Sequence, residues 1–200
     1  CWLAILVHQD TLRRQLARNV SLITAVADYF LSVRPMVKEP ILVELVMLRQ
    51  SEEGVFRDEL TGLYNRRYLN QELPSEMERF RRFGHPFSLL MLDLDHFKRI
   101  NDTFGHLAGD QVLRDLAGVL QQTARLYDRA VRYGGEEFVI ILPQVSREEA
   151  VVAAERIRVA VASHEFLHEG KDLGPVTVSI GAATYPMDAM NSEALVAKAD

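Results

Sequence analysis

The chain has 200 residues, which is enough for one well-buried domain and an additional segment. Its apolar share of 48% and charged share of 26% are ordinary for a soluble globular protein. The net charge of −5 disfavours a protein that coats DNA or RNA through bulk positive charge, and we expect neither as a partner. A lone cysteine, Cys1, excludes a disulfide framework and a cysteine-based zinc site and is typical of a reducing compartment.

An N-terminal helical segment is expected over residues 1–56. Its apolar start, Cys1 to Val7, is too short to span a bilayer and is consistent with the end of a membrane helix or with a buried strand. Apolar residues recurring every three or four positions predict one helix over 11–33, and Pro35 and Pro40 interrupt the pattern after it. A second helix is predicted over 41–56, either as a connector packed on a neighbour, which we slightly favour, or as a dimerising signalling helix.

The chain lacks an initiator Met, which indicates a piece of a longer protein. We expect a cytoplasmic protein, with the alternative that a region outside this sequence tethers it to the inner membrane.

From Asp58 onward, predicted strands and helices alternate, which favours an α/β sandwich. The strands are expected over 88–94, 130–133, 138–142 and 176–182. The helices are expected over 97–104, 111–123 and 147–162, with Ser146 as an N-cap, and a last helix opens at Asn191 or Ser192.

Glycines mark two of the predicted turns. Gly134 and Gly135 separate two strand-like runs and predict a tight hairpin, because both residues can take a positive φ. Gly105 and Gly109 flank His106 and suggest a second tight loop after the short helix.

Acidic residues lie where a predicted strand ends and where the predicted hairpin turns. Asp93 and Asp95 close the strand, and Glu136 and Glu137 follow the two glycines. If strand and hairpin are neighbours, Asp93 and one glutamate converge, and converging carboxylates call for a shared proton or cation. Such an oxygen site suits Mg²⁺ completed by substrate phosphates. The alternative is a helix cap and solvated turn residues, and the acids alone would favour it.

Four segments carry a resemblance to a known family. Residues 132–138, Arg-Tyr-Gly-Gly-Glu-Glu-Phe, resemble the signature of the GGDEF diguanylate cyclases in its Gly-Gly-Glu-Glu-Phe form. Residues 93–106, followed by Gly109 and Asp110, resemble the family's second motif. Residues 58–67 resemble its first motif and residues 178–181 a later strand. The motifs are in order and at family spacing, which chance does not readily produce.

The resemblance implies a fold and a domain organisation. The fold would be α/β of the α+β kind: a mostly antiparallel five-stranded sheet wrapped by helices, similar to nucleotide-cyclase and polymerase palm domains. Residues 57–200 would be the GGDEF domain. Residues 1–56 would belong to a sensory or dimerisation region or a linker. The family usually continues past Asp200, with a Lys and an Arg that grip the triphosphate.

The resemblance also implies catalytic and metal-binding residues. The side chains of Asp93 and Glu136 and the carbonyl of Leu94 would bind Mg²⁺, with Mn²⁺ as a substitute. Glu136, or Glu137 beside it, would assist removal of the proton from the attacking 3′-hydroxyl. Lys98 would neutralise phosphate charge, whereas outside this motif a solvated helix charge would be the preferred reading.

Substrate-binding residues follow from the same resemblance. Asn101 and Asp110 would read guanine, and a carboxylate at 110 can accept from the guanine N1–H and exocyclic amine together. His106 and Phe97 would contact the nucleotide. The alternative for His106 is a residue that only stabilises its loop.

The implied activity is the condensation of two GTP into cyclic di-GMP and two pyrophosphates across a homodimer, under the control of an upstream sensory region. Arg125, Asp128 and Arg156 resemble the family's inhibitory product site, although Arg125 and Asp128 could simply form a surface ion pair. The main alternative is an inactive GGDEF domain that acts as a receptor for GTP or cyclic di-GMP. A cyclase making another cyclic nucleotide and a structural dimerisation module are further alternatives.

Overall fold

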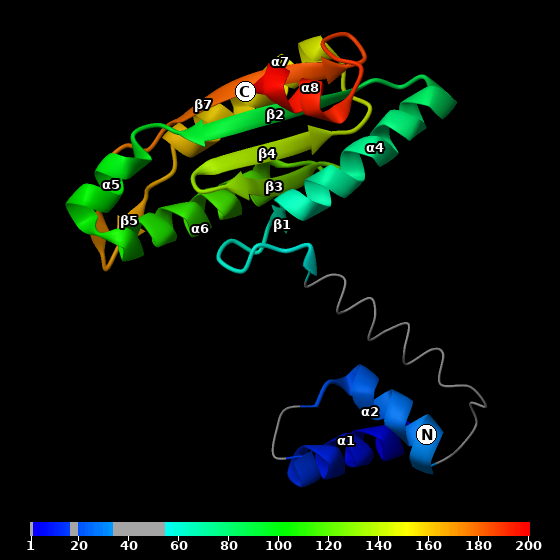
Figure 1. Ribbon diagram of the computed structural model, residues 1–200. Helices are drawn as coiled ribbons and strands as arrows, with labels where there is room; N and C mark the ends of the chain where they lie inside the picture. Colours follow the sequence, from blue (N-terminus) through cyan, green and yellow to red (C-terminus); the bar gives the residue numbers. More distant parts are fainter. Residues whose placement is uncertain (1, 17–19, 34–54) are drawn as a thin grey trace. The chain divides into compact units, whose positions relative to one another are not determined.

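The structure, a computed structural model, describes residues 2–16, 20–33 and 55–200. It divides into two compact units, Cys1–Val55 and Phe56–Asp200, and each is treated by itself (Figure 1). In the described part of the chain, no helix combines the length and the apolar character that crossing a membrane requires.

The N-terminal unit contains α1 (Trp2–Leu16), α2 (Leu22–Asp28) and a π-helix, η1 (Tyr29–Val33). The prediction of one helix over 11–33 is wrong, because α1 ends at Leu16 and Ser21 caps a new helix by accepting from the Thr24 N–H at 3.1 Å. The strand reading of the first residues is wrong as well, since they are helical from Trp2. The second helix, predicted over 41–56, lies outside the described residues except for its last two positions.

Packing and two polar contacts hold α1 to the segment after it. Ile5 and Tyr29 are buried. The Gln9 amide donates to the Val20 carbonyl at 2.8 Å, and the His8 imidazole lies 2.6 Å from the Asp28 carboxylate. These contacts close a small helical hairpin.

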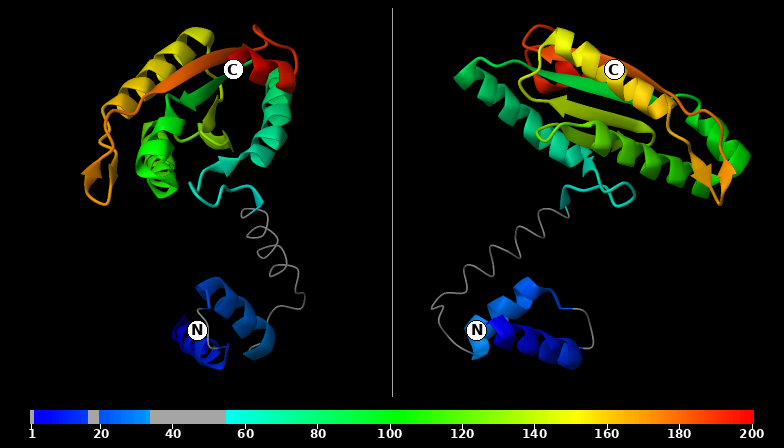
Figure 2. Two further views of the ribbon diagram at one scale, coloured as in Figure 1. Left: turned by 60° about the vertical axis from the view of Figure 1, so that its left-hand side comes forward. Right: turned by 180° about the vertical axis from the view of Figure 1, so that it is seen from behind.

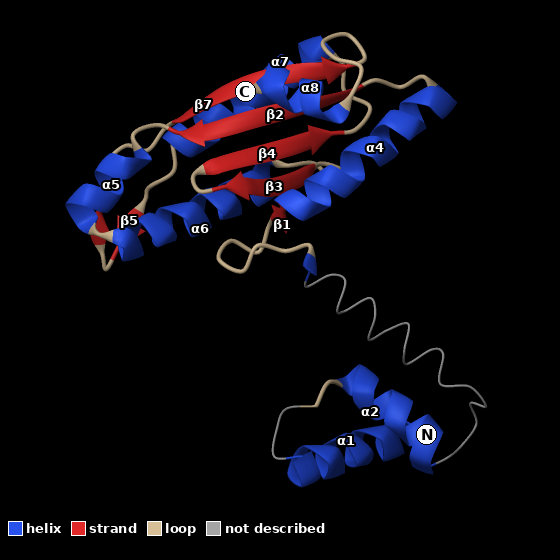
Figure 3. Ribbon diagram, in the orientation of Figure 1, coloured by secondary structure: helices blue, strands red, loops and turns tan. Residues whose placement is uncertain are grey.

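The second unit is built on a five-stranded sheet with the order β1-β3-β4-β2-β7 (Figure 3). Its strands are β1 (Tyr64–Asn65), β2 (Phe87–Leu94), β3 (Arg129–Gly134), β4 (Glu137–Leu142) and β7 (Val178–Tyr185). Only the β1–β3 pair is parallel, so the mostly antiparallel α+β fold expected from the resemblance is confirmed. Two short strands, β5 (Leu167–His168) and β6 (Lys171–Asp172), form a separate hairpin.

Helices cover both faces of this sheet (Figure 2). α4 and α8 lie on one face, and α6 and α7 lie on the other. The helices are α4 (Arg66–Phe83), α5 (Phe97–Phe104), α6 (His106–Thr123), α7 (Arg147–Ala162) and α8 (Ser192–Ala199).

Most predicted elements of this unit are present, with corrections at their ends. α5 and α7 have the predicted bounds, and Ser146 and Asn191 cap α7 and α8. α6 begins at His106 instead of residue 111, so Gly109 lies inside a helix and the predicted second loop is reduced to Gly105. The last strand starts two residues later than predicted and runs on to Tyr185.

The central strand β2 is buried on both sides, which explains its continuous apolar run. Leu90, Leu92 and Leu94 belong to the core beneath α6 and α7, whereas Leu89 and Met91 belong to the core beneath α4 and α8. Because side chains alternate along a strand, Asp93 points to the α4 and α8 side, at the end where β2 leaves the sheet.

Candidate active site

The acids at the end of β2 and in the turn between β3 and β4 meet at one end of the sheet. In the paired strands Asp93 lies opposite Glu137 on β4 and opposite Ser179 on β7, so these three side chains share a face. The Leu94 N–H donates to the Glu136 carbonyl at 3.4 Å. The structure therefore brings together Asp93, Leu94 and Glu136, the three residues proposed from the sequence as metal ligands.

The electrostatics of this end favour a cation. Burial, the Asp95 charge and the Asp200 charge raise the pKa of Asp93. Burial raises the pKa of Glu136, and the charges of Asp93 and Glu137 raise it further. Within the described residues, neither the Asp93 carboxylate nor the Glu136 carboxylate has a hydrogen bond or ion pair. Repelling carboxylates with free oxygens are stabilised when a positive charge lies between them.

The donor set fits a hard divalent ion that shares its coordination with a substrate. Two carboxylates and one backbone carbonyl leave positions for phosphate oxygens, as Mg²⁺ sites in nucleotide-handling enzymes do. No group of three or more His, Cys, Asp or Glu side chains in the described ranges could hold a metal by itself. A site of this composition would be completed by the nucleotide.

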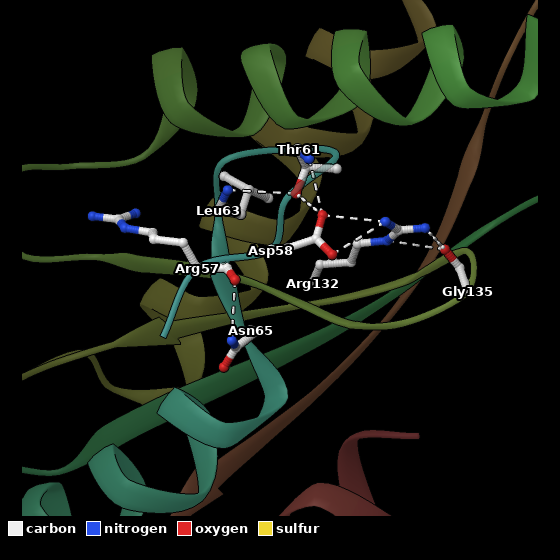
Figure 4. Close-up of polar contacts among 7 residues, drawn as sticks. All are labelled: Arg57, Asp58, Thr61, Leu63, Asn65, Arg132 and Gly135. Atoms are coloured by element: carbon white, nitrogen blue, oxygen red, sulfur yellow. Dashed lines mark hydrogen bonds and ion pairs between the residues drawn. The ribbon is translucent and has the colours of Figure 1, made fainter. Parts of the chain in front are cut away.

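Arg132 stabilises the turn that carries Glu136 by bonding to the backbone of the turn (Figure 4). Arg132 donates from Nε and Nη2 to the Gly135 carbonyl at 3.2 and 2.9 Å. Its Nη1 donates to both carboxylate oxygens of Asp58 at 3.1 and 3.2 Å. Gly135 itself has a φ of 41°, a conformation that L side chains rarely adopt, which explains a glycine here.

Asp58 also organises the first motif (Figure 4). It accepts from the Thr61 backbone N–H at 2.9 Å and from the Thr61 hydroxyl at 2.6 Å. Burial alone would raise its pKa, but the bonds from Thr61 and Arg132 together lower it. Asn65 closes the same loop by donating to the Arg57 carbonyl at 3.1 Å. Sequence reasoning missed this link to the turn that carries Glu136, because no local pattern pairs residues 58 and 132.

The residues proposed to read guanine lie together between α5 and α6. A Cβ on Gly109 would be 2.0 Å from Asn101 Oδ1 and 3.2 Å from Phe97 Cζ, so the glycine allows α5 to pack closely on α6. Asp110 follows Gly109, and Asp110 and Asn101 are half-buried. The Phe97 side chain is only 7% exposed and belongs to the core, so any contact it makes with a nucleotide would come from its backbone.

Lys98 and His106 are both exposed. Lys98 lies in the first turn of α5, just after the acids, and His106 opens α6 after Gly105. Their positions leave both side chains accessible to a bound nucleotide.

The proposed product site lies at the start of β3. Asp128 Oδ2 accepts from the Arg125 backbone N–H at 2.7 Å, and the structure gives no ion pair between their side chains in the described residues. Arg156 Nη2 donates to the Thr123 carbonyl at 3.3 Å, which places the α7 arginine beside the segment that leads to Arg125. The surface ion pair offered as the alternative is thus not formed, and the Arg125 side chain is exposed.

A cavity of about 630 Å³ between α4, α8 and the sheet adjoins the acids. Glu137 and Asp200 line one part of it, and Arg66 and Tyr133 line another, with the guanidinium 4.3 Å from the ring centroid. Sequence reasoning did not anticipate this cavity, because α4 was not predicted.

Comparisons with known proteins identify the family of this domain. The family description "Diguanylate cyclase, GGDEF domain" matches residues 55–200. Response regulator PleD of Caulobacter vibrioides is 44% identical over 154 residues, which cover 76% of this chain and 34% of that protein. Diguanylate cyclase DosC of Escherichia coli K12 is 35% identical over 181 residues, covering 90% of this chain and 39% of DosC. This chain therefore spans between a third and two fifths of the length of these relatives.

Solved structures show the same fold. The GGDEF domain of DgcB from Caulobacter crescentus in complex with c-di-GMP has a TM-score of 0.68 and 37% identity, with 72% of this chain and 85% of that chain covered. The structure of the DgcB coiled coil and GGDEF domain has a TM-score of 0.74 and 34% identity, with 90% and 91% covered. From its motifs, its fold and these matches, the chain belongs to the GGDEF family of diguanylate cyclase domains.

Proposed function

We propose that this chain is the catalytic part of a diguanylate cyclase, which converts two GTP into cyclic di-GMP and two pyrophosphates. The observation that carries the proposal is the meeting of Asp93 and Glu136 beside the Leu94 backbone, with neither carboxylate bonded to another group in the described residues. Relatives named diguanylate cyclase, at 35–44% identity, support the same activity.

Asp93, Glu136 and the Leu94 carbonyl would hold Mg²⁺, with Mn²⁺ as a substitute. A bound ion of this kind neutralises phosphate charge and makes the attacking hydroxyl more acidic. The raised pKa values of Asp93 and Glu136 support this role, because burial and neighbouring negative charges both destabilise the ionised carboxyls in the absence of a cation.

The chain's own side chains would carry the proton and the phosphate charge. The 3′-oxygen of one GTP forms a bond to the α-phosphorus of the other, and pyrophosphate leaves. Glu136 or Glu137 accepts the hydroxyl proton, and Lys98 stabilises the charge on the transferred phosphoryl group.

Guanine would be read between α5 and α6. Asp110 accepts from the N1–H and the exocyclic amine, and Asn101 contacts the same base. Their half-buried positions around Gly109 support this arrangement, since hydrogen bonds that exclude water discriminate more strongly between bases.

The reaction requires two copies that face each other, because each domain supplies one GTP. We infer that residues 1–56 belong to a sensory or dimerisation region that sets this orientation. The whole chain should therefore exceed a chain beginning at Val55 in activity and in the fraction of dimer. Equal activity and equal oligomeric state would refute this part of the proposal.

Product feedback would act through Arg125, Asp128 and Arg156. Two guanidinium groups at one surface suit the phosphates and guanine edges of cyclic di-GMP. The cyclic di-GMP in the DgcB structure supports a ligand of this kind. We expect Arg125→Ala to lose product binding and inhibition, and unchanged inhibition would exclude the site.

The second candidate function is a receptor that binds GTP or cyclic di-GMP without catalysis. Retention of Asp93, Lys98, Glu136 and Glu137 favours the enzyme. Incubation of a full-length protein containing this chain with GTP and Mg²⁺, with separation of the products by mass, decides between the two. Cyclic di-GMP that disappears in Glu136→Ala supports catalysis, whereas nucleotide binding without product supports the receptor.

A further inference from the structure

Asp95, two residues beyond Asp93, forms three hydrogen bonds with Thr177 and Ser179, at the start of β7 and just before it. The Thr177 hydroxyl donates to Oδ2 and the Ser179 hydroxyl donates to Oδ1, each at 2.6 Å. The Asp95 N–H donates to the Thr177 carbonyl at 3.0 Å. Hydroxyl-to-carboxylate bonds of this length are charge-assisted and stronger than neutral ones.

These bonds fix the corner where β2 turns into α5. On one side of the corner the Leu94 N–H donates to the Glu136 carbonyl, and on the other side Asp95 is bonded to Thr177 and Ser179. The next residue, His96, is left-handed, with φ 59° and ψ 26°, and α5 begins directly after it. The direction in which α5 leaves, and with it the position of Lys98, depends on this anchoring.

The bonds to Asp95 also leave the Asp93 carboxylate without a hydrogen bond from Ser179. Ser179 lies directly opposite Asp93 in the β2–β7 pairing, so its side chain is on the same face as the Asp93 carboxylate. Its hydroxyl is nevertheless donated to Asp95. In the described part of the chain, Asp93 consequently keeps both oxygens without a protein hydrogen bond.

We propose that Asp95 is a positioning residue for the reaction. Held by Thr177 and Ser179, it fixes the corner that presents the Leu94 carbonyl and Lys98, and it takes up the hydroxyl that would otherwise bond to Asp93. It does not itself touch the nucleotide. This inference rests on the proposed cyclase function.

The deciding comparison uses two double variants of the whole chain. Thr177→Val with Ser179→Ala removes both hydroxyls, whereas Thr177→Ser with Ser179→Thr keeps them. We expect the first pair to lower kcat by about tenfold to a hundredfold, because displacements near 1 Å at a reacting centre have effects of that size. The second pair should stay within about threefold of the unsubstituted chain.

The KM for GTP separates positioning from a general loss of structure. Asn101 is on α5, as Lys98 is, but it lies one turn further along the helix, where α5 also packs on α6 at Gly109, and Asp110 is on α6 itself. The KM for GTP should therefore change by less than about threefold in the variant without hydroxyls.

Amide hydrogen exchange, measured without metal or nucleotide, gives a readout independent of activity. Residues 94–98 should exchange faster in the variant without hydroxyls, and the remaining strands should keep their protection. If that variant does not fold, Ser179→Ala alone becomes the deciding variant for both measurements.

Three results would overturn the inference. They are a kcat within twofold of the unsubstituted chain, equal loss in the two double variants, and faster exchange throughout the domain. If the unsubstituted chain makes no cyclic di-GMP, the proposed function fails, and the exchange measurement still tests whether Asp95 anchors the corner.

Discussion

At the scale of single residues, Gly109 lies inside a helix but leaves room for the Asn101 side chain. A glycine inside α6 costs helix stability, yet a Cβ here would collide with Asn101 Oδ1 at 2.0 Å. The contact is with the end of a short side chain and not with backbone, so Asn101 is the group that must move.

Gly109→Ala should therefore impair nucleotide binding more than folding. We expect the dissociation constant for GTP to rise about tenfold to a hundredfold, the range for losing one base-specific contact. Stability should change little, because the gain in helix propensity of about 1 kcal/mol offsets the local clash. Isothermal titration and thermal unfolding measure the two effects.

Gly118 in the same helix provides the matched control, since nothing lies within 4 Å of a Cβ built there. Gly118→Ala should stabilise the domain by about 1 kcal/mol without changing GTP affinity. Equal GTP affinities in the two alanine variants would show that Asn101 does not read the base.

Asp93 should reduce the stability of the metal-free domain at neutral pH. Folding raises the pKa of this carboxyl, so the folded state binds its proton more tightly than the unfolded state. The resulting stabilisation is complete below the unfolded pKa, near 4, and is lost as the pH rises through the folded pKa. Asp93→Asn should therefore raise stability at pH 7 by about 0.5 kcal/mol, a small effect because solvent screens the exposed group.

Calorimetry at pH 4 and pH 7 in EDTA tests this expectation. The difference between Asp93→Asn and the unsubstituted chain should shrink at pH 4. Added Mg²⁺ with GTP should stabilise the unsubstituted chain more than the variant. A variant that is less stable than the unsubstituted chain at pH 7 without metal would contradict the local excess of negative charge.

At the scale of elements, the Asp58–Arg132 ion pair connects the first motif, residues 58–67, to the turn at Gly135 and Glu136. The two side chains are 23% and 16% exposed, so removing one leaves a half-buried charge without its partner. Asp58→Ala should cost about 1–3 kcal/mol and lower kcat, because Arg132 then holds the Gly135 carbonyl less firmly.

An exposed ion pair on α7 provides the control. Arg158 and Glu155 are 48% and 60% exposed, so Arg158→Ala should change stability far less than Asp58→Ala and leave kcat unchanged. Urea unfolding and initial rates measure both variants. If Asp58→Ala behaved like Arg158→Ala, the first motif would have no part in supporting the turn.

Local patterns explain which elements could be predicted from the sequence. The run before Asp93 and the capped helix after Ser146 each carry a complete local signal, and both are present as predicted. α4 was missed because Pro74 lies inside it and its 18 residues are strongly polar. The prediction of a single helix over 11–33 was wrong because the apolar periodicity continues past Ser21, although Ser21 caps a new helix there.

The candidate site also has a part that the sequence predicts and a part that it does not. The motif identified Asp93 and Glu136, and the pairing of Asp93 with Glu137 and the Leu94–Glu136 backbone bond place them at one end of the sheet. The supports of this site are bonds between distant positions, such as Arg132 to Asp58 and Ser179 to Asp95. No periodicity or spacing encodes such bonds, so only the folded chain reveals them.

At the scale of the whole molecule, the proposed chemistry exceeds what one chain can do. The domain of residues 56–200 has one pair of acids proposed to bind metal and one site proposed for guanine, whereas cyclic di-GMP is made from two GTP molecules. An active assembly must therefore contain two competent domains in a symmetric pair.

Mixing the unsubstituted chain with Glu136→Gln tests this requirement. If only dimers with two intact sites complete the product, an exchanged equimolar mixture should retain about one quarter of the activity of the same total amount of unsubstituted chain. Independent sites would retain about one half. The variant removes one charge from the turn and leaves the N-terminal unit untouched, so the two chains should pair at random. Product quantified by mass after full subunit exchange distinguishes the two values, and a result of one half would show that a single intact site completes the cyclic product.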